Sequence, residues 1–385
     1  MKGMVFRMSN ETTANVGDTS KVRWGKVFLL SGALCSYLIG SGFASGQEIL
    51  QFYSGYGAIS LVGVLLTEFI FLWMAYQLYS LGYKKQFKNP FEIYEFYLGK
   101  WAGKVYEWYS VLLFYLFFVV MSAGGGAVLN QYFGINAYVG TIIIGVASMA
   151  SCLLGLHKLI NVLGTIGPAV ILFTIIIGIG AIMYDPAAMS TVDGVIAGLP
   201  ADAQPAHAAA NFFISAIMYN ALCLAIGLPF FVACGTECQN LKEARVAGMV
   251  GFTVYTAAIL LVTLSHFAFM GAITTVAIPA LFIAGEIIPP LAVVFSIIIL
   301  CEIYTTAAPM LWATSRSFGP DGSKISYIVI GVAGVIGTFG GGIFPFGTLV
   351  NVLYPAMSWL ALGFMAAMLV KQFIIKDKTP NVFEK

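Results

Sequence analysis

The chain has 385 residues, of which 59% are hydrophobic and only 9% are charged, and its mean hydropathy is +0.90. Soluble domains carry about 25% charged residues, so this composition excludes an ordinary soluble protein and predicts an integral membrane protein. Apolar segments of about 20 residues favour helices, because the strands of a membrane barrel alternate over about 10 residues. The formal net charge is only +2, so the placement of the charges is more informative than their sum.

The hydrophobic pattern predicts an all-α integral membrane protein with ten transmembrane helices. The expected spans are residues 26–53, 57–81, 104–127, 137–156, 158–184, 211–238, 246–271, 289–317, 324–342 and 346–371. The corresponding domains are a cytoplasmic N-terminal tail (1–25), a first transmembrane repeat (26–184), an extracellular loop (185–210), a second transmembrane repeat (211–371) and a cytoplasmic C-terminal tail (372–385).

The basic residues support this count, because all 19 of them fall on one side of a ten-span arrangement. Under the positive-inside rule that side is the cytoplasm, so we expect both termini there in a multi-pass protein of the cell membrane. Five is an odd number of spans, so two similar halves would have opposite orientations in the membrane. We therefore expect an inverted 5+5 repeat.

The first span contains a stretch, residues 36–48, that is unusual for a membrane helix. Its sequence is Ser-Tyr-Leu-Ile-Gly-Ser-Gly-Phe-Ala-Ser-Gly-Gln-Glu. Each glycine costs a helix about 1 kcal/mol relative to alanine, and unwound backbone inside a bilayer must be buried in protein or line a cavity. The stretch predicts a broken helix at a ligand site. The alternative is an intact, glycine-rich helix that lets its neighbours pack closely.

A comparable interruption is expected in span six, the first helix of the second half. There the sequence Tyr219-Asn220-Ala221-Leu222-Cys223 is followed by Gly227 and Pro229. Interrupted helices in corresponding positions of two halves point to the midplane site of a transporter.

The residues of the first interruption carry a resemblance to known families. Gly40-Ser41-Gly42-Phe43 resembles the Gly-Ser-Gly-Ile motif in the first helix of the amino acid–polyamine–organocation superfamily, which has the leucine-transporter (LeuT) fold. Residues 42–52, with the sequence GFASGQEILQF, more closely resemble the YkvI family of bacterial membrane proteins, which is grouped with amino acid permeases. The resemblance covers residues 26–371 and implies a LeuT-type 5+5 inverted repeat with broken helices 1 and 6.

Span eight contains a polar helix face that suits an ion. Glu302, Thr305, Thr306 and Pro309 follow one another at positions i, i+3, i+4 and i+7, so they share one face. Hydroxyl and carbonyl oxygens are the ligands of a hard cation. The resemblance implies a sodium site made by the carbonyls of Ser36, Ile39 and Glu302 and the hydroxyls of Thr305 and Thr306.

Two alternatives exist for this face. Threonine hydroxyls in a helix can instead bond back to a carbonyl one turn earlier. The Glu302 carboxylate, which replaces the small residue usual in the resembling proteins, can take part in the ion site or carry a proton.

Three acids lie well inside apolar segments: Glu48, Glu68 and Glu302. Each costs about 2.5–3.5 kcal/mol at the centre of a bilayer unless it is paired or faces a cavity, so such acids indicate functional sites. For Glu68 the resemblance implies a brace between the unwound segments of helices 1 and 6; the alternative is a protonated residue between helices. Glu48 is expected at the outer half of span one, where it would line the entrance.

The substrate site is expected between the two interruptions. Freed N–H groups at a helix start suit a carboxylate, and the side chains of span six add donors and acceptors. The expected substrate-binding residues are Gly40, Ser41, Gly42, Phe43, Ala44, Tyr115, Tyr219 and Asn220. Tyr115 has the simpler alternative of a packing residue. The absence of Lys and Arg from the middle of the spans argues against a strongly anionic substrate.

These features predict an ion-coupled secondary transporter rather than an enzyme. The sequence has no nucleotide-binding motif, so an ion gradient would have to drive transport. We expect symport of sodium with a small amino acid or similar zwitterion, with no cofactor beyond a coupling Na⁺ or H⁺. The expected partners are the small-molecule substrate and the lipid bilayer, without nucleic acid, and the oligomeric state is open.

Three other functions fit parts of the pattern. The first is a membrane amino-acid sensor of the same fold. The second is a proton-coupled permease that uses Glu302. The third is a channel, which paired interruptions fit less well than an occluded site.

Overall fold

The computed structural model describes residues 21–87, 91–154, 171–319 and 322–375, and within these ranges it is helical and contains no strand. Its helices are α1 (Trp24–Leu38), α2 (Ser41–Ser45), α3 (Gln47–Phe52), η1 (Ser54–Ile59), α4 (Ser60–Lys85), α5 (Glu92–Phe133), α6 (Ala137–Leu154), α8 (Ala188–Gly198), η2 (Ala201–Ala203), α9 (Phe212–Thr236), α10 (Leu241–Ala268), α11 (Met270–Ile273), α12 (Pro279–Ile287), α13 (Pro289–Arg316), α14 (Lys324–Ile343), α15 (Phe346–Leu369) and η3 (Val370–Ile375).

Seven of the described helices are long and apolar enough to cross a membrane. An eighth candidate is the helix Ile171–Tyr184 taken together with α8, from which it is bent by 83°. Expected spans one and four contain the shorter apolar helices Trp24–Leu38 and Ala137–Leu153. The start of expected span five, residues 155–170, lies outside the described residues, so the count of ten remains a prediction.

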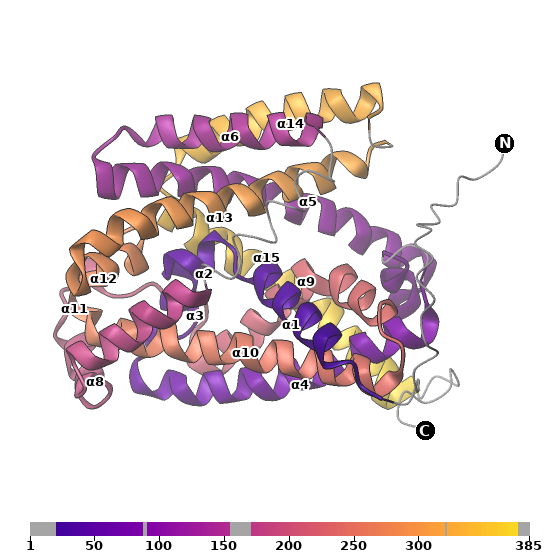
Figure 1. Ribbon diagram of the computed structural model, residues 1–385, viewed down its shortest axis with the longest axis horizontal. Coiled ribbons are helices and arrows are strands. Elements are labelled where there is room, and N and C mark those ends of the chain that lie inside the picture. The colour runs from indigo at the N-terminus through magenta and orange to yellow at the C-terminus, as the bar shows by residue number, and fades with distance from the viewer. Residues whose placement is uncertain (1–20, 88–90, 155–170, 320–321, 376–385) are drawn as a thin grey trace.

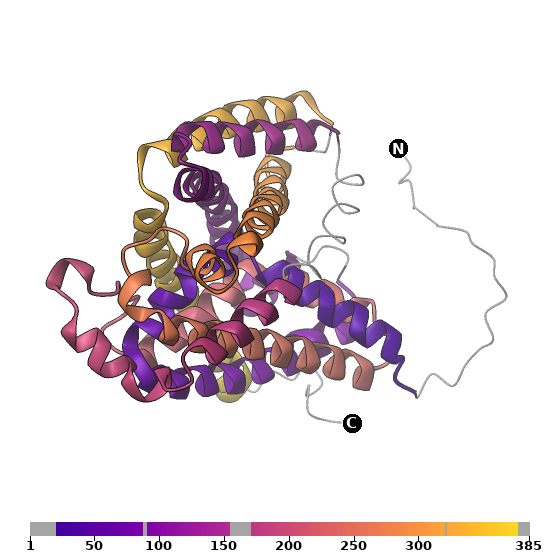
Figure 2. The same ribbon diagram turned by 60° about the vertical axis from the view of Figure 1, so that its left-hand side comes forward.

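The long helices form two groups (Figures 1 and 2). In the first group α4 packs against α9 and α10, and α1 packs against α10. In the second group α5, α6, α13 and α14 pack against one another, and α6 and α14 stay paired in both views. Helix α15 contacts both α9 and α5. The short helices α2 and α3 lie between the groups, because α2 contacts α13 and α5 while α3 contacts α9 and α10.

The first span is interrupted where its sequence predicts. Helix α1 ends at Leu38, and Ile39 has φ −75° and ψ 86°, which is an inverse γ-turn closed by the Gly40 N–H on the Leu38 carbonyl at 2.9 Å. Gly40 is extended, with φ −97° and ψ −177°, before α2 begins. A second interruption follows at Gly46, whose φ of +82° is left-handed and suits only glycine without strain.

The interruption expected in span six does not occur, and this correction concerns α9. The helix is continuous from Phe212 to Thr236 although Pro229 lies inside it. Proline has no N–H for the carbonyl four residues earlier, Ala225, and its ring crowds that turn. The Tyr37 hydroxyl donates to the neighbouring Ile226 carbonyl at 3.0 Å. A side chain of α1 thus hydrogen-bonds the strained turn, and the helix continues through it.

Basic residues from distant parts of the chain meet at one end of the molecule. Arg23, just before α1, donates three hydrogen bonds to the Glu243 carboxylate at the start of α10, the shortest at 2.6 Å. These hydrogen bonds raise the pKa of the Arg23 guanidinium. Lys85 at the end of α4 and Lys371 after α15 both lie over the Phe96 ring, at 5.5 and 4.1 Å from its centroid. The start of α1 therefore lies beside the start of α10, and the end of α4 lies near the end of α15.

Candidate functional site

The interruption of the first span lies against α13. A Cβ on Gly40 would be 3.7 Å from Cγ2 and 3.9 Å from Oγ1 of Thr306, so unwound backbone and this threonine are in contact. The Gly40 N–H would continue the helix to Ser36 but bonds to Leu38 instead. The first helical hydrogen bond of α2 is accepted by the Gly40 carbonyl, so the Ile39 carbonyl precedes the hydrogen-bonded turns of α2. The carbonyls of Ser36 and Ile39 are thus outside the helical ladders on either side.

Thr305 and Glu302 are hydrogen-bonded to each other. The Thr305 hydroxyl donates to the Glu302 carbonyl at 2.9 Å, which is the bonding back along the helix that the sequence left as an alternative. The Glu302 side chain is buried, and its Oε2 has no hydrogen-bond partner among the described residues. Of the five expected ion ligands, Thr306 is the side chain that borders the interruption directly.

A chain of hydroxyl groups connects Glu48 on α3 to the same interruption. The Tyr219 hydroxyl of α9 donates to Glu48 Oε1 at 2.7 Å and lies 2.6 Å from the Tyr255 hydroxyl of α10. Tyr255 in turn reaches the Leu38 carbonyl at 3.4 Å. Both tyrosines are buried, and Glu48 is 8% exposed. A buried carboxylate, two phenols and the Leu38 carbonyl, which also accepts the Gly40 N–H, therefore form one polar chain.

The glycine-rich turn of α2 brings Glu48 near α15. A Cβ on Gly42 would lie 2.5 Å from Glu48 Oε2 and 2.7 Å from the Tyr354 hydroxyl, so only glycine leaves both groups in place. Phe43 is buried, with its ring 5.3 Å from the ring of Tyr255. The buried Ala44 closes the first turn of α2 by donating to the Gly40 carbonyl. The expected residues Gly40, Gly42, Phe43, Ala44 and Tyr219 lie around this one region, and α2 starts at Ser41.

The brace between the first span and α9 is Thr67, not Glu68. The Thr67 hydroxyl lies 2.7 Å from the Tyr53 hydroxyl and accepts a hydrogen bond from the Asn220 amide at 3.1 Å. Glu68 is one residue along α4, which turns it by about 100°. Its Oε1 accepts from Thr253 of α10 at 2.6 Å. Glu68 thus joins α4 to α10, as in the alternative of a residue between helices.

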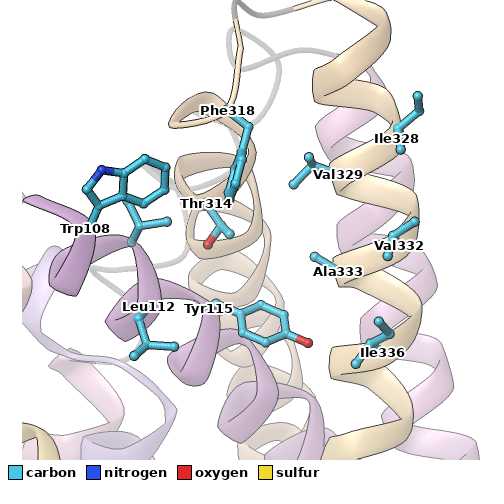
Figure 3. Close-up of a pocket in the computed structure, with 11 residues that line it drawn as sticks. Trp108, Leu112, Tyr115, Thr314, Phe318, Ile328, Val329, Val332, Ala333 and Ile336 are labelled. Carbon is cyan, nitrogen blue, oxygen red and sulfur yellow. The ribbon is translucent and has the colours of Figure 1, made fainter.

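Tyr115 was expected at the substrate site, with packing as the simpler alternative, and its surroundings are apolar. Its ring points into an apolar cavity of about 610 Å³ between α5, the end of α13 and α14 (Figure 3). The cavity is lined by Trp108, Val111, Leu112, Tyr115, Thr314, Phe318, Ile328, Val329, Val332, Ala333 and Ile336. On α5, Phe117 lies near the site, since its ring is 5.0 Å from that of Tyr354 and tilted against it. Depth in a span does not define which face a residue occupies.

The sequence reading missed the contribution of α15. Gln51 of α3 donates to the Asn351 carbonyl at 3.0 Å, and Tyr354 follows one turn later on the same helix. The side-chain oxygens of Gln47, Gln51 and Asn351 and the Tyr354 hydroxyl are buried without partners in the described part of the chain. A signal was present, because Asn351 and Tyr354 are polar residues at i, i+3 within an otherwise apolar span.

Comparison with solved structures defines the class of the fold. The chain matches the inward-facing conformation of Mhp1 over 91% of its own length and 77% of the other chain, with a TM-score of 0.63 and 13% identity. It matches MhsT in complex with L-phenylalanine over 91% and 89%, with a TM-score of 0.59 and 15% identity. A Na⁺-coupled sialic acid symporter matches over 92% and 88%, with a TM-score of 0.54 and 14% identity. These proteins are membrane transporters, not enzymes, and the fold shared with them is the LeuT fold.

Comparison with curated sequences confirms the expected resemblance to YkvI. The chain is 22% identical to the uncharacterized membrane protein YkvI of Bacillus subtilis (strain 168) over an alignment of 348 residues that covers 87% of this chain and 93% of the relative. The chain also matches the uncharacterized protein YyaD of the same organism. This match has 38% identity over 97 residues and covers 25% of this chain and 27% of that protein. No protein-family model matches the chain.

Proposed function

We propose that this protein is a secondary active transporter that couples a cation, sodium, to the uptake of a small amino acid or similar zwitterionic solute. The observation that carries the proposal is the contact between the unwound backbone at Gly40 and Thr306 of α13. It joins the two helix groups at a point where carbonyls have left the helical ladder. Unwound carbonyls that face a hydroxyl in a membrane protein suit a coupling ion.

The ion would be held by oxygen atoms alone. The carbonyls of Ser36 and Ile39 and the hydroxyl of Thr306 supply three ligands, and Glu302 with Thr305 supplies the others once the Thr305 hydroxyl turns from the Glu302 carbonyl. Sodium is a hard cation, so this set of neutral oxygens matches its preference. The described residues hold no cluster of three or more His, Cys, Asp or Glu side chains that would favour a transition metal.

Transport would proceed by alternating access. The group of α1, α4, α9 and α10 would rock against the group of α5, α6, α13 and α14, with α2 and α3 between them. In this proposal residues 26–184 and 211–371 are the two inverted repeats, residues 185–210 are extracellular, and the basic helix ends with both terminal tails, 1–25 and 372–385, face the cytoplasm.

The ion site is tested by the melting temperature of purified protein in sodium and in potassium at equal ionic strength. A sodium concentration of 100 times the dissociation constant adds about 2.7 kcal/mol of stability. We expect a rise specific to sodium in the wild type and its loss in Thr306→Ala. Thr338→Ala is the matched control, since Thr338 is a buried threonine on α14 whose hydroxyl donates to the Gly334 carbonyl one turn earlier. A sodium response that survives in Thr305→Ala/Thr306→Ala would refute the site.

A second candidate is coupling to protons through Glu302, favoured by its buried and unpartnered Oε2. It predicts a melting temperature that depends on pH, does not respond to sodium, and loses its pH dependence in Glu302→Gln. Saturable uptake of solute into vesicles containing only this polypeptide would separate either transporter from a receptor of the same fold.

A further inference from the structure

Glu48 is a buried carboxylate that no basic side chain compensates in the described structure. The ion pairs found there join helix ends or neighbouring turns, such as Arg23 with Glu243 and Lys26 with Glu237. An acid at membrane depth without such a partner is costly and marks a functional group. Glu48 accepts a hydrogen bond from Tyr219 through Oε1, which leaves Oε2 as its free face.

Oε2 lies near an oxygen that is buried without a partner in the described residues, the hydroxyl of Tyr354. Glu48 Oε2 and the Tyr354 hydroxyl lie 2.5 and 2.7 Å from the same point, the position of a Cβ on Gly42. The Tyr354 side chain is fully buried and its hydroxyl has no hydrogen-bond partner in the described residues, so the two oxygens are close without being bonded to each other. A cationic donor between them would satisfy both.

We propose that Glu48 and Tyr354 bind the positively charged amino group of the transported solute. An ammonium group has three donors and no acceptor, which complements a carboxylate and a phenol oxygen. Charge-assisted hydrogen bonds of this kind are about twice as strong as neutral ones. The inference rests on the proposed transport function and names the solute class, which is compounds with a primary amine.

The glycine at position 42 gives this site its specificity. Its missing side chain keeps Oε2 and the Tyr354 hydroxyl in place, because a Cβ there would lie within 2.7 Å of both. A solute with a hydroxyl group in place of the amine would offer one neutral donor and would leave the carboxylate uncompensated. Leaving a buried charged group without its partner costs more than a neutral hydrogen bond does.

The test uses matched probes on the purified, full-length protein. The probes are the L-amino acids, the corresponding 2-hydroxy acids and the corresponding primary amines, and the measurement is the melting temperature as a function of probe concentration in sodium buffer. The variants are Glu48→Gln, Tyr354→Phe and the control Glu68→Gln, whose carboxylate instead accepts a hydrogen bond from Thr253.

We expect at least one amino acid to bind wild type and Glu68→Gln about tenfold or more tightly than its hydroxy acid. Glu48→Gln should lose this preference, and Tyr354→Phe should weaken amine binding by about two- to tenfold. Without a probe, Tyr354→Phe should melt like wild type, because it removes only an unpartnered hydroxyl. Tyr354→Phe therefore decides the matter if Glu48→Gln does not fold.

Three results would overturn the inference: equal binding of the hydroxy acid, a preference that persists in Glu48→Gln, or no response to any amine. The sodium-specific rise in melting temperature, and its loss in Thr306→Ala, tests the transporter proposal separately. A sodium response together with binding of a solute without an amine would leave transport supported and the role of Glu48 refuted.

Discussion

At the scale of single residues, the candidate site depends on the absence of a side chain at its glycines. Gly42 brings backbone against Glu48 and Tyr354, where any larger residue would collide with these side chains, whereas a Cβ on Gly40 would make ordinary contact with Thr306. Packing of this kind is specified by shape, so it is sensitive to the addition of a single methyl group.

Gly42→Ala tests this sensitivity. The new Cβ would lie within 2.8 Å of three side-chain atoms of Glu48 and Tyr354, so we expect a loss of about 1–3 kcal/mol in the free energy of unfolding. Gly32→Ala on α1 is the control, because no atom lies within 4 Å of its Cβ position. That change should be neutral or stabilise by up to about 1 kcal/mol. Equal effects of the two changes, measured by denaturant unfolding in detergent, would contradict the geometry.

Residue types were easier to predict from the sequence than residue contacts. Tyr219 was expected at the substrate site and Glu48 at the entrance, and a hydrogen bond joins the two, because buried polar groups in a membrane must find partners. Tyr354 was missed, and Tyr115 lines an apolar cavity. A side chain's depth follows from its position in a span, whereas its direction depends on how the helix is rotated by its neighbours.

At the scale of elements, the second turn in the first span is as specific as the first. Gly46 joins α2 to α3 with a left-handed φ of +82°, and a Cβ there would lie 2.7 Å from Nε2 of His266. His266 in turn lies 2.8 Å from the Ser54 hydroxyl through Nδ1. The path of α3 toward α9 and α15 therefore depends on this one residue.

Gly46→Ala and Gly134→Ala separate backbone strain from crowding. Both residues have a left-handed φ, which costs an alanine about 1–2 kcal/mol. Gly134 has nothing within 4 Å of its Cβ position, whereas Gly46 meets His266 and Pro279. We expect Gly46→Ala to lower the melting temperature by clearly more than Gly134→Ala. If both variants melted alike, the contact with His266 would not constrain the turn.

Glycine and proline had different consequences in the two expected interruptions. In the first span the glycines coincide with broken backbone, because Gly40 and Gly46 adopt conformations outside the α-helix. In α9, Pro229 leaves the helix continuous, because packing and the Tyr37 hydrogen bond tolerate the missing donor. The sequence shows where a helix is weak, and the surrounding structure decides whether it breaks there.

At the scale of the whole molecule, the hydrophobic pattern was sufficient to predict an all-helical membrane fold. Seven of the expected segments form long apolar helices in the described residues, and the fold is shared with Mhp1 and MhsT. The length of such spans is set by the thickness of the bilayer, so they can be predicted from the sequence without any knowledge of packing.

The orientation can be measured with a membrane-impermeant maleimide on intact cells. Each described cysteine is buried or half-buried, so the native background should label weakly. Gly194→Cys on α8 should label from outside, because Gly194 is exposed and has open space around it. Lys100→Cys, also at an exposed position, should label only after the cells are opened. The reverse pattern would invert the proposed topology.

The chain of hydroxyls from Glu48 through Tyr219 and Tyr255 to the Leu38 carbonyl has an energetic consequence. It links the proposed amine site to the backbone turn beside the proposed ion ligands, so a charge bound at one end polarises the other. We expect such a connection to make the two proposed ligands cooperative. By thermodynamic reciprocity, the factor by which sodium tightens amine binding must equal the factor by which the amine tightens sodium binding. Tyr255→Phe should reduce both factors together, because it removes the hydroxyl that connects the two sites. The coupling between sodium and solute would then depend on this one hydroxyl group.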